Sequence, residues 1–230
     1  FLEDGDVANI SAESYQIYDS LKNKIKREIS EIDISSEALS KGEYKHFMEK
    51  EIFEQPVAVL NTIDGRVGGD DVLENIFGIG SSDVFSKVKR IQIVACGTSL
   101  HAARVAANWF SAISELPTQT DYASEYRYRN PHVDEDTLFV TISQSGETAD
   151  TLAALKYAKE KDFLSTVTIC NVPTSTIARE SEFSIFTNAG PEIGVASTKA
   201  FTTQLVALML LALSLAKSRS RNPKLRGRVI

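Results

Sequence analysis

Apolar runs alternate with helical patterns along the chain from Arg90 onward. Apolar residues at helical spacing predict helices at residues 100–113, 148–161, 175–181 and 198–217. Five short runs, most of them rich in apolar residues, predict β-strands at residues 91–96, 118–123, 137–143, 165–170 and 183–186. Nearly continuous apolar strands separated by helices are typical of a parallel sheet that is covered on both faces. The pattern therefore predicts an α/β fold, a three-layer αβα sandwich around a five-stranded parallel sheet.

The beginning of the chain has a weaker pattern. Residues 1–20 contain short alternating runs, such as residues 15–18, which suggest strands but show no obvious partners. Residues 21–42 are charged and polar and end in Lys-Gly, which is typical of a linker. We therefore expect the main fold to begin near residue 43.

A helical lead-in precedes the sheet. Residues 43–61 carry apolar residues at helical spacing, and Pro56 should break or restart this helix because proline lacks the N–H that a helix interior needs. Residues 69–88 predict short helical pieces separated by glycines. At the other end, residues 218–230 form a basic tail. A solvated helix end or a linker is favoured there over a nucleic-acid contact.

Composition and charge limit the classes of partner. The chain has 230 residues, of which 43% are hydrophobic, and this is ample for a sizeable core. Its net charge of -6 argues against a basic nucleic-acid surface, so local dipoles and donors must hold any anionic ligand. The longest apolar run, residues 205–213, is far shorter than the roughly 20 residues needed to cross a bilayer. We expect neither nucleic acid nor a membrane as a partner.

Several kinds of site find no support. Cys96 and Cys170 each end an apolar strand and are expected to be buried and reduced, which fits a cytoplasmic location. They do not form a C-x-x-C pair, and no two of the three histidines share a metal-ligand spacing, so no metal or cofactor is predicted. Neither G-x-G-x-x-G nor G-x-x-x-x-G-K-[ST] occurs, which argues against dinucleotide and triphosphate sites. Phe1 stands where an initiator methionine would, so we expect a piece of a longer chain.

The most informative turn is residues 143–148, Ser-Gln-Ser-Gly-Glu-Thr. It follows a predicted strand and opens a predicted helix, whose first N–H groups have no intrahelical partner and carry a partial positive charge. The hydroxyls of Ser143, Ser145 and Thr148 add donors, and Gly146 permits a tight turn. The turn is therefore predicted to bind a phosphate, with the Glu147 carboxylate directed away from it toward solvent or a neighbouring donor.

Two further polar turns share this context. Residues 97–99, Gly-Thr-Ser, and residues 192–198, Glu-Ile-Gly-Val-Ala-Ser-Thr, also follow strands and open helices. In a parallel sheet all such turns lie at the carboxyl edge, where ligands bind at the point at which the strand order reverses. One such turn is usually only a helix cap, but three at one edge favour a binding site.

The sequence leaves open the roles of three ionisable residues near these turns. Lys199 could add positive charge near the ligand or face an acidic neighbour. His101 could touch a ligand, although packing or solvent exposure is favoured, and Glu192 lies in the third turn.

Four motifs together resemble the sugar isomerase (SIS) domain family. They are residues 96–99, 143–151, 170–173 and 192–203. Their pattern is most similar to the first SIS domain of the glutamine–fructose-6-phosphate aminotransferase (isomerizing) family. Residues 44–56 resemble the lead-in of that domain, and residues 1–7 are similar to the end of the family's glutaminase domain. The resemblance implies a Rossmann- or flavodoxin-like SIS fold over residues 43–217, a glutaminase remnant over residues 1–20, and a tail that leads to a second SIS domain.

The resemblance also implies a function. The family transfers ammonia from glutamine to fructose 6-phosphate and isomerises the product to glucosamine 6-phosphate in the cytoplasm, without a cofactor, and the chains pair as dimers. By their place in the motifs, the expected ligand contacts are Ser143, Gln144, Ser145 and Thr148 for the sugar phosphate, Thr98 and Ser99 for phosphate or sugar hydroxyls, and Val195, Ala196 and Ser197 for the sugar.

Two departures from the family pattern indicate half of a site. The glutaminase cysteine and the second SIS domain, which supplies the family's acid/base residues, are not in this sequence. We therefore expect hexose 6-phosphate binding without turnover by this chain alone. Two alternatives stay open: a sugar-phosphate-sensing regulatory module with a helix-turn-helix within residues 43–88, and a stand-alone isomerase that uses His101 and Glu192.

Overall fold

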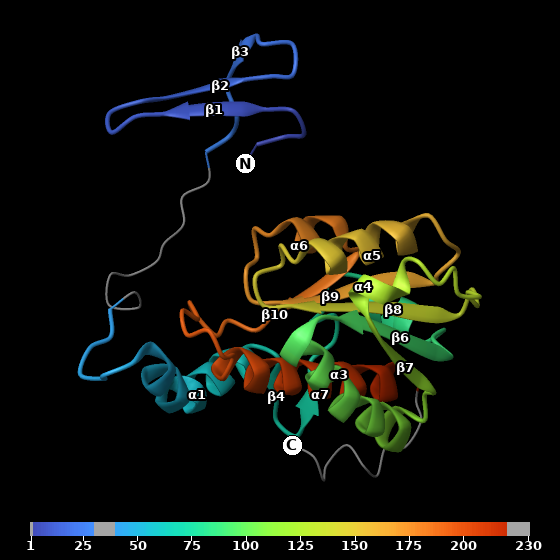
Figure 1. Cartoon of the computed structure of the whole chain (residues 1–230). Coiled ribbons are helices and arrows are strands. Elements are labelled where there is room, and N and C mark those ends of the chain that lie inside the picture. The colour runs from blue at the N-terminus through green and yellow to red at the C-terminus, as the bar shows by residue number, and fades with distance from the viewer. Residues whose placement is uncertain (1, 30–39, 220–230) are drawn as a thin grey trace. The chain divides into compact units, whose positions relative to one another are not determined.

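The computed structural model of the protein describes residues 2–29 and 40–219. The chain divides into two compact units, residues 1–40 and 41–230, which are considered separately (Figure 1). Residues 30–39 of the predicted linker and residues 220–230 of the predicted basic tail lie outside the described residues.

The first unit is a small antiparallel sheet in the order β1-β2-β3, formed by Val7–Ile10, Tyr15–Tyr18 and Lys24–Ile25. The expectation that the strand at residues 15–18 lacks partners is wrong, because β2 pairs on both sides. Its Ile17 is buried, opposite Ala8 and Ile25. β3 also lies inside the range predicted as a linker, since its two residues are too short a pattern to recognise as a strand.

The second unit contains the five-stranded parallel sheet that the pattern predicted. Its order is β10-β9-β8-β6-β7, and every neighbouring pair is parallel. The strands are Arg90–Ala95 (β6), Thr118–Tyr122 (β7), Thr137–Ser143 (β8), Ser165–Cys170 (β9) and Phe183–Phe186 (β10). The expected boundaries hold within one residue.

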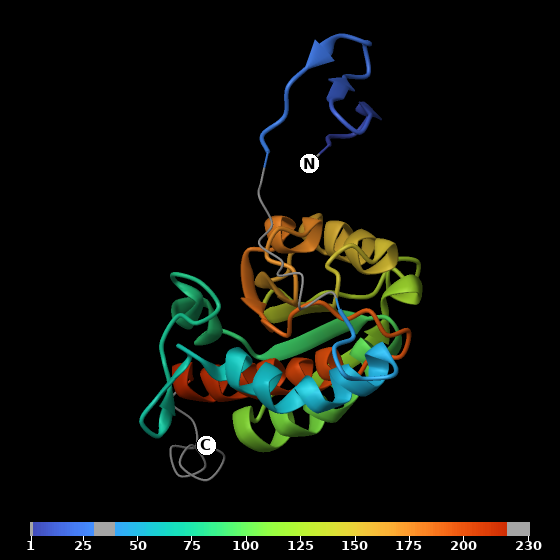
Figure 2. The ribbon, with the colours of Figure 1, turned by 90° about the vertical axis from the view of Figure 1, so that its left-hand side faces the viewer.

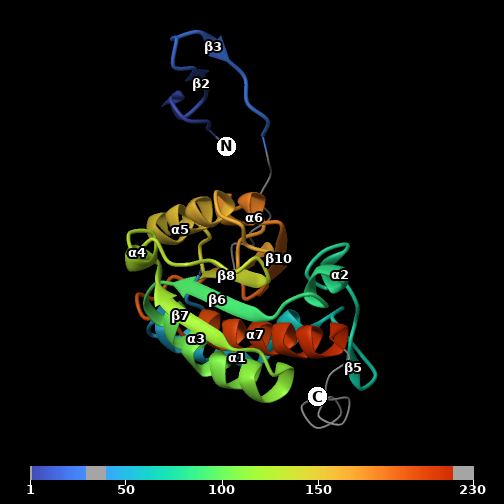
Figure 3. The same cartoon turned by 90° about the vertical axis from the view of Figure 1, so that its right-hand side faces the viewer.

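Helices cover both faces of this sheet, so the predicted three-layer sandwich is confirmed (Figures 1 and 3). One face carries α3 (Gly97–Trp109), a π-helical turn (Phe110–Ser114), α7 (Lys199–Ser218) and the lead-in helix α1 (Phe47–Ile63). The other face carries α4 (Ala123–Tyr126), α5 (Ala149–Lys159) and α6 (Thr176–Glu180). The strands serve both cores, since Leu138 and Val140 pack in the first and Phe139 in the second.

α1 is continuous through Pro56, contrary to the expected break. A proline in a helix removes the hydrogen bond to the carbonyl four residues earlier, here that of Ile52. The side chain of Gln55 donates from Nε2 to this carbonyl at 3.1 Å. The neighbouring side chain therefore satisfies the acceptor that Pro56 leaves, and the helix does not need to end.

The segment between α1 and the sheet is only partly helical. Val67–Gly68 (β4) and Asp71–Val72 (β5) form a hairpin whose turn contains Gly69 at φ +60°, and only α2 (Ser81–Phe85) is a helix. The expectation of short helical pieces across residues 69–88 is therefore right only for α2. Because a hairpin separates α1 from α2, these two helices do not form a helix-turn-helix.

α7 lies alongside α1 and α3 (Figure 2). By length and composition alone its 20 residues could cross a membrane, but 67% of its apolar window is buried inside the protein. Leu208, Leu211 and Leu215 are fully buried in the same core as β6 and β8. The expected buried helix is confirmed.

Candidate functional site

Two of the predicted turns open side by side where the connections reverse direction. β6 and β8 are neighbours, with Ala95 opposite Ile142. The chain leaves β6 through α3 toward β7, whereas it leaves β8 through α5, on the other face, toward β9. The Thr151 hydroxyl in α5 donates to Cys96 Sγ at 3.8 Å across this junction. The turns at residues 97–99 and 143–148 therefore flank the switch point at which parallel α/β sheets bind ligands.

The hydroxyls of the second turn hold its own backbone. Ser143 Oγ, which belongs to a 3% exposed residue, accepts from Gly146 N at 3.0 Å and lies 3.0 Å from Thr148 Oγ1. Ser145 is exposed, and its Oγ accepts from Glu147 N at 3.2 Å. Thr148 is the N-cap of α5, but its side chain makes no capping hydrogen bond. The turn is thus organised in advance, and the cap residue leaves the first N–H groups of α5 to a ligand.

Gly146 brings this turn against the start of α6. It has φ +67°, and a Cβ added there would lie 2.1 Å from Ser175 Oγ. Its carbonyl accepts from Ile177 N at 3.1 Å. The Glu147 carboxylate accepts from Thr176 N at 2.6 Å, so the prediction that it finds a neighbouring donor is confirmed.

The first turn is more open. Cys96 is the N-cap residue of α3, which begins at Gly97 and not at residue 100 as predicted, and the Cys96 side chain makes no capping hydrogen bond. Thr98 is exposed and Ser99 is 8% exposed, both in the first turn of the helix. His101 is exposed.

The third turn differs, because a carboxylate of its own occupies the start of α7. Glu192 Oε1 accepts from Thr198 N at 2.9 Å and from Ala200 N at 3.1 Å, and its Oε2 accepts from Ser197 Oγ at 3.0 Å. The side chains of Val195 and Ala196 are exposed. A carboxylate therefore caps the start of α7, whereas the N-cap side chains of α3 and α5 make no capping hydrogen bond.

Asn171, which was not among the predicted site residues, connects the second turn to the loop between β10 and the third turn. Its backbone N–H donates to the Gln144 carbonyl at 3.1 Å. Its side-chain Oδ1 accepts from Ala189 N at 2.8 Å, and its Nδ2 donates to the Gly190 carbonyl at 2.8 Å. A short polar residue directly after a buried strand was the available signal. Asn171 therefore ties the second turn to the loop that precedes the third turn.

A buried ammonium group at this edge of the sheet forms an ion pair with a carboxylate. Lys199, whose side chain is 5% exposed, pairs with Glu54 at 2.6 Å. Of the two roles that the sequence left open for Lys199, the structure thus shows the acidic neighbour. In α1, Glu51 binds the third turn, but a single glutamate in an amphipathic helix offers no signal in the sequence for such a role.

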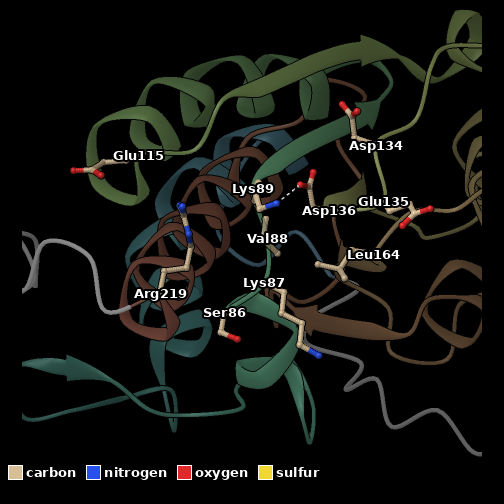
Figure 4. Close-up of a pocket in the computed structure, with 10 residues that line it drawn as sticks. All are labelled: Ser86, Lys87, Val88, Lys89, Glu115, Asp134, Glu135, Asp136, Leu164 and Arg219. Carbon is tan, nitrogen blue, oxygen red and sulfur yellow. Dashed lines mark ion pairs between the residues drawn. The ribbon is translucent and has the colours of Figure 1, made fainter.

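A wide cavity of about 950 Å³ opens at the opposite edge of the sheet, where β6 and β8 begin (Figure 4). Lys89 and Asp136 form an ion pair of 2.9 Å on its wall. None of the nine predicted site residues lines it. Across residues 2–29 and 40–219 there is no group of three His, Cys, Asp or Glu side chains that could hold a metal ion.

Cys170 gives the fold a pH dependence above neutrality. Burial raises the pKa of its thiol from 9.0 to about 11. Between these two values the unfolded thiol loses its proton while the folded one keeps it, so stability should fall as the pH rises from 9 to 11. The expected loss is on the order of 2 kcal/mol. The free energy of unfolding, measured with urea, should fall less between pH 9 and pH 11 in Cys170→Ala than in the parent. An equal fall in the two proteins would contradict the assignment.

The comparisons with known proteins agree with this geometry. The chain is 54% identical over 221 residues to a glutamine–fructose-6-phosphate aminotransferase (isomerizing) of Pseudomonas aeruginosa, which covers 96% of this chain and 36% of that protein. The corresponding enzyme of Haemophilus influenzae is 50% identical, and the match covers 94% of this chain and 36% of that protein. The chain thus spans about a third of the length of these relatives.

Solved structures place the fold in the same group. The C-terminal domain of glucosamine-fructose-6-phosphate aminotransferase from Francisella tularensis has a TM-score of 0.78 and 47% identity, and the match covers 81% of this chain and 52% of that one. A glucosamine-6-phosphate deaminase from Thermotoga maritima, 18% identical with a TM-score of 0.59 over 79% of this chain and 51% of that one, shows the shared fold alone. The SIS domain family matches residues 84–214, more than half of the chain, and the protein therefore belongs to the SIS domain family.

Proposed function

We propose that this chain binds a hexose 6-phosphate, fructose 6-phosphate or glucosamine 6-phosphate, at the carboxyl edge of its sheet. It would form the sugar-binding half of the isomerase region of a glutamine–fructose-6-phosphate aminotransferase. The observation that carries the proposal is the turn at residues 143–148, which lies at the switch point and opens α5 with no capping side chain. The names of the relatives support the choice of sugar phosphate.

The three turns divide the ligand between them. The phosphate belongs at the starts of α5 and α3, where Ser143, Gln144, Ser145 and Thr148 lie together with Thr98 and Ser99. The start of α7 is bound by Glu192 and would repel a phosphate, so Val195, Ala196 and Ser197 are assigned to the sugar. Hydrogen bonds to a charged group contribute about 1.5–3 kcal/mol each. Four or five of them, reduced by the entropy of binding, correspond to micromolar to millimolar affinity.

The same contacts support a site that binds without reacting. The carboxylates of Glu147 and Glu192 are bonded to helix-start amides, and the Lys199 ammonium is paired with Glu54. Of the residues that a stand-alone isomerase would need, Glu192 is therefore used as a cap, and His101 is exposed. The acid/base chemistry belongs, in this proposal, to a second SIS domain.

We propose that the partners of this domain are the other domains of a longer protein. We assign residues 1–20 to the end of a glutaminase domain, 21–42 to a linker, 43–217 to the first SIS domain and 218–230 to a connection to a second SIS domain, in a cytoplasmic homodimer.

An exposed apolar stripe on α1 supports protein partners for this unit. It consists of Met48, Ile52, Phe53, Val57 and Leu60, which are 42% to 67% exposed.

Substitutions in the second turn test the phosphate assignment. Ser145→Ala and Thr148→Val each remove a hydroxyl donor, and each should weaken fructose 6-phosphate binding about tenfold, measured by calorimetry on the whole chain. The control is Ser86→Ala, an exposed serine on the rim of the opposite cavity, which should leave the affinity unchanged. Parent-like affinity in both turn variants would refute the assignment. Glucosamine 6-phosphate formation by this chain alone would refute the division of labour.

A further inference from the structure

The lead-in helix α1 and Arg66, which follows it, bond to the chain between the end of β10 and the start of α7. The contacts near the carboxyl end of α1 reach the end of β10 and the residue after it, and those near its amino end reach the third turn and the first residues of α7. The contacts are Arg66 Nη2 to the Phe186 carbonyl, Thr62 Oγ1 to the Thr187 carbonyl, Glu51 to Ile193 and Gly194, Glu54 to Lys199, and Thr202 Oγ1 to Gln55. The turn therefore rests on a rigid element far from it in sequence.

Glu51 makes the central contact. Its residue is 2% exposed. Its Oε1 accepts from Ile193 N at 2.5 Å and from Gly194 N at 3.0 Å, and its Oε2 accepts from Gly194 N at 3.2 Å. The described part of the chain contains no ion pair to this carboxylate. Two successive backbone amides are thus the groups that stabilise a buried charge, through hydrogen bonds that are stronger than neutral ones.

The approach of Glu51 depends on a glycine. A Cβ added to Gly194 would lie 2.5 Å from Glu51 Oε2 and 3.4 Å from Met48 Cα. The helix and the turn are therefore as close as their backbones permit, which leaves the carboxylate little freedom to move.

A second carboxylate, that of Glu192, holds the chain on the other side of the exposed residues Val195 and Ala196. Glu192 binds Ser197 Oγ and the amides of Thr198 and Ala200. Val195 and Ala196, the exposed residues between the two anchors, form a two-residue bridge. Because both ends of so short a bridge are fixed, its conformation depends on both carboxylates.

We propose that Glu51 is a positioning residue, whose carboxylate fixes the backbone of Ile193 and Gly194 and so presents Val195 and Ala196 to the sugar. The inference rests on the proposed function, in which the third turn contacts the sugar and the second turn binds the phosphate. The inference distinguishes binding of the sugar from binding of the phosphate, since Glu51 supports only the third turn, which contacts the sugar.

The test compares Glu51→Gln with Glu49→Gln in the whole chain. Glutamine keeps the size of the side chain, and its amide oxygen can take the place of Oε1, but the negative charge is lost and an N–H₂ group replaces Oε2, which accepts from Gly194 N at 3.2 Å. Glu49 is exposed on the same helix and serves as the matched control. In Glu51→Gln the amide resonances of residues 193–197 should shift or broaden, while those of residues 143–148 stay as in the parent. Fructose 6-phosphate should bind about tenfold more weakly, and inorganic phosphate should bind as in the parent.

The outcomes distinguish the two proposals. If the parent binds no hexose phosphate, the proposed function fails, and the resonances of residues 193–197 still decide whether Glu51 holds the turn. Unchanged amide resonances of residues 193–197 in Glu51→Gln would overturn the positioning role. So would a loss of affinity for inorganic phosphate as large as that for fructose 6-phosphate, since equal losses indicate general unfolding. A double-mutant cycle adds an independent reading. Gly194→Ala should weaken fructose 6-phosphate binding more in the parent than in Glu51→Ala, which lacks the atoms that the new Cβ would meet.

Discussion

Replacing Gly146 with alanine should destabilise the protein by about 2–4 kcal/mol and remove most of its hexose phosphate affinity. Two costs add at this position. A left-handed conformation, here φ +67°, is unfavourable for alanine. The new Cβ would also lie 2.1 Å from Ser175 Oγ and 2.4 Å from Ser175 Cβ. Because the second of these atoms is attached to the backbone, the side chain cannot rotate away, and the turn must move from the start of α6.

Gly65 provides the matched control, since it has the same φ of +67° but no atom within 4 Å of its added Cβ. Gly65→Ala should therefore cost only the conformational part, about 1 kcal/mol, and should leave binding unchanged. Urea unfolding gives both stabilities, and calorimetry gives the affinities of the folded variants. Equal losses of stability at the two glycines would show that the contact with Ser175 does not constrain the turn.

Replacing Glu54 with glutamine should destabilise the protein by about 2–3 kcal/mol. The Lys199 ammonium, 5% exposed, would then stay buried without its carboxylate at 2.6 Å. Removing one partner of a buried pair costs about 3–5 kcal/mol, and the cost is reduced here because a third of the Glu54 side chain reaches water. The pair joins α1 to the first residue of α7, so its loss should also loosen the third turn.

The exposed pair between Lys159 and Glu180 is the control for this change. Its side chains are 44% and 38% exposed, and Glu180→Gln should cost less than about 1 kcal/mol. Adding Lys199→Met to Glu54→Gln should restore part of the stability, because no buried charge is then left unpaired. If Glu54→Gln and Glu180→Gln have equal effects in thermal unfolding, the ion pair contributes no more than a surface pair.

The sheet could be predicted because its information is local. In β8, each of the seven residues is buried, and a run of this kind indicates a strand covered on both faces without knowledge of its neighbours. The common edge of the polar turns followed from the same pattern, since turns after parallel strands lie at the carboxyl edge, whereas the position of the switch point is given by the strand order of the structure. The errors arose where a non-local or side-chain partner decides the outcome. Gln55 preserves the helix at Pro56, and β1 and β3 pair with β2, for which the sequence shows no obvious partners.

The destinations of the acidic side chains could not be predicted in the same way. Glu51, Glu54, Glu147 and Glu192 look alike in the sequence. In the structure they brace the third turn, pair with a buried lysine, cap α6 and cap α7, respectively. The first three reach partners between 29 and 145 positions away along the chain.

The sequence by itself predicted the layers and the strands, and it predicted that the polar turns share one edge of the sheet, because periodicity and helix-start chemistry act over a few neighbouring residues. Only the tertiary structure decided which helix starts are open to an anion and which are already closed by a carboxylate. The start of α6 is closed by Glu147 from 29 positions away, and the start of α7 by Glu192 from within its own turn, because the fold of each loop places that carboxylate within hydrogen-bond distance of the helix-start amides.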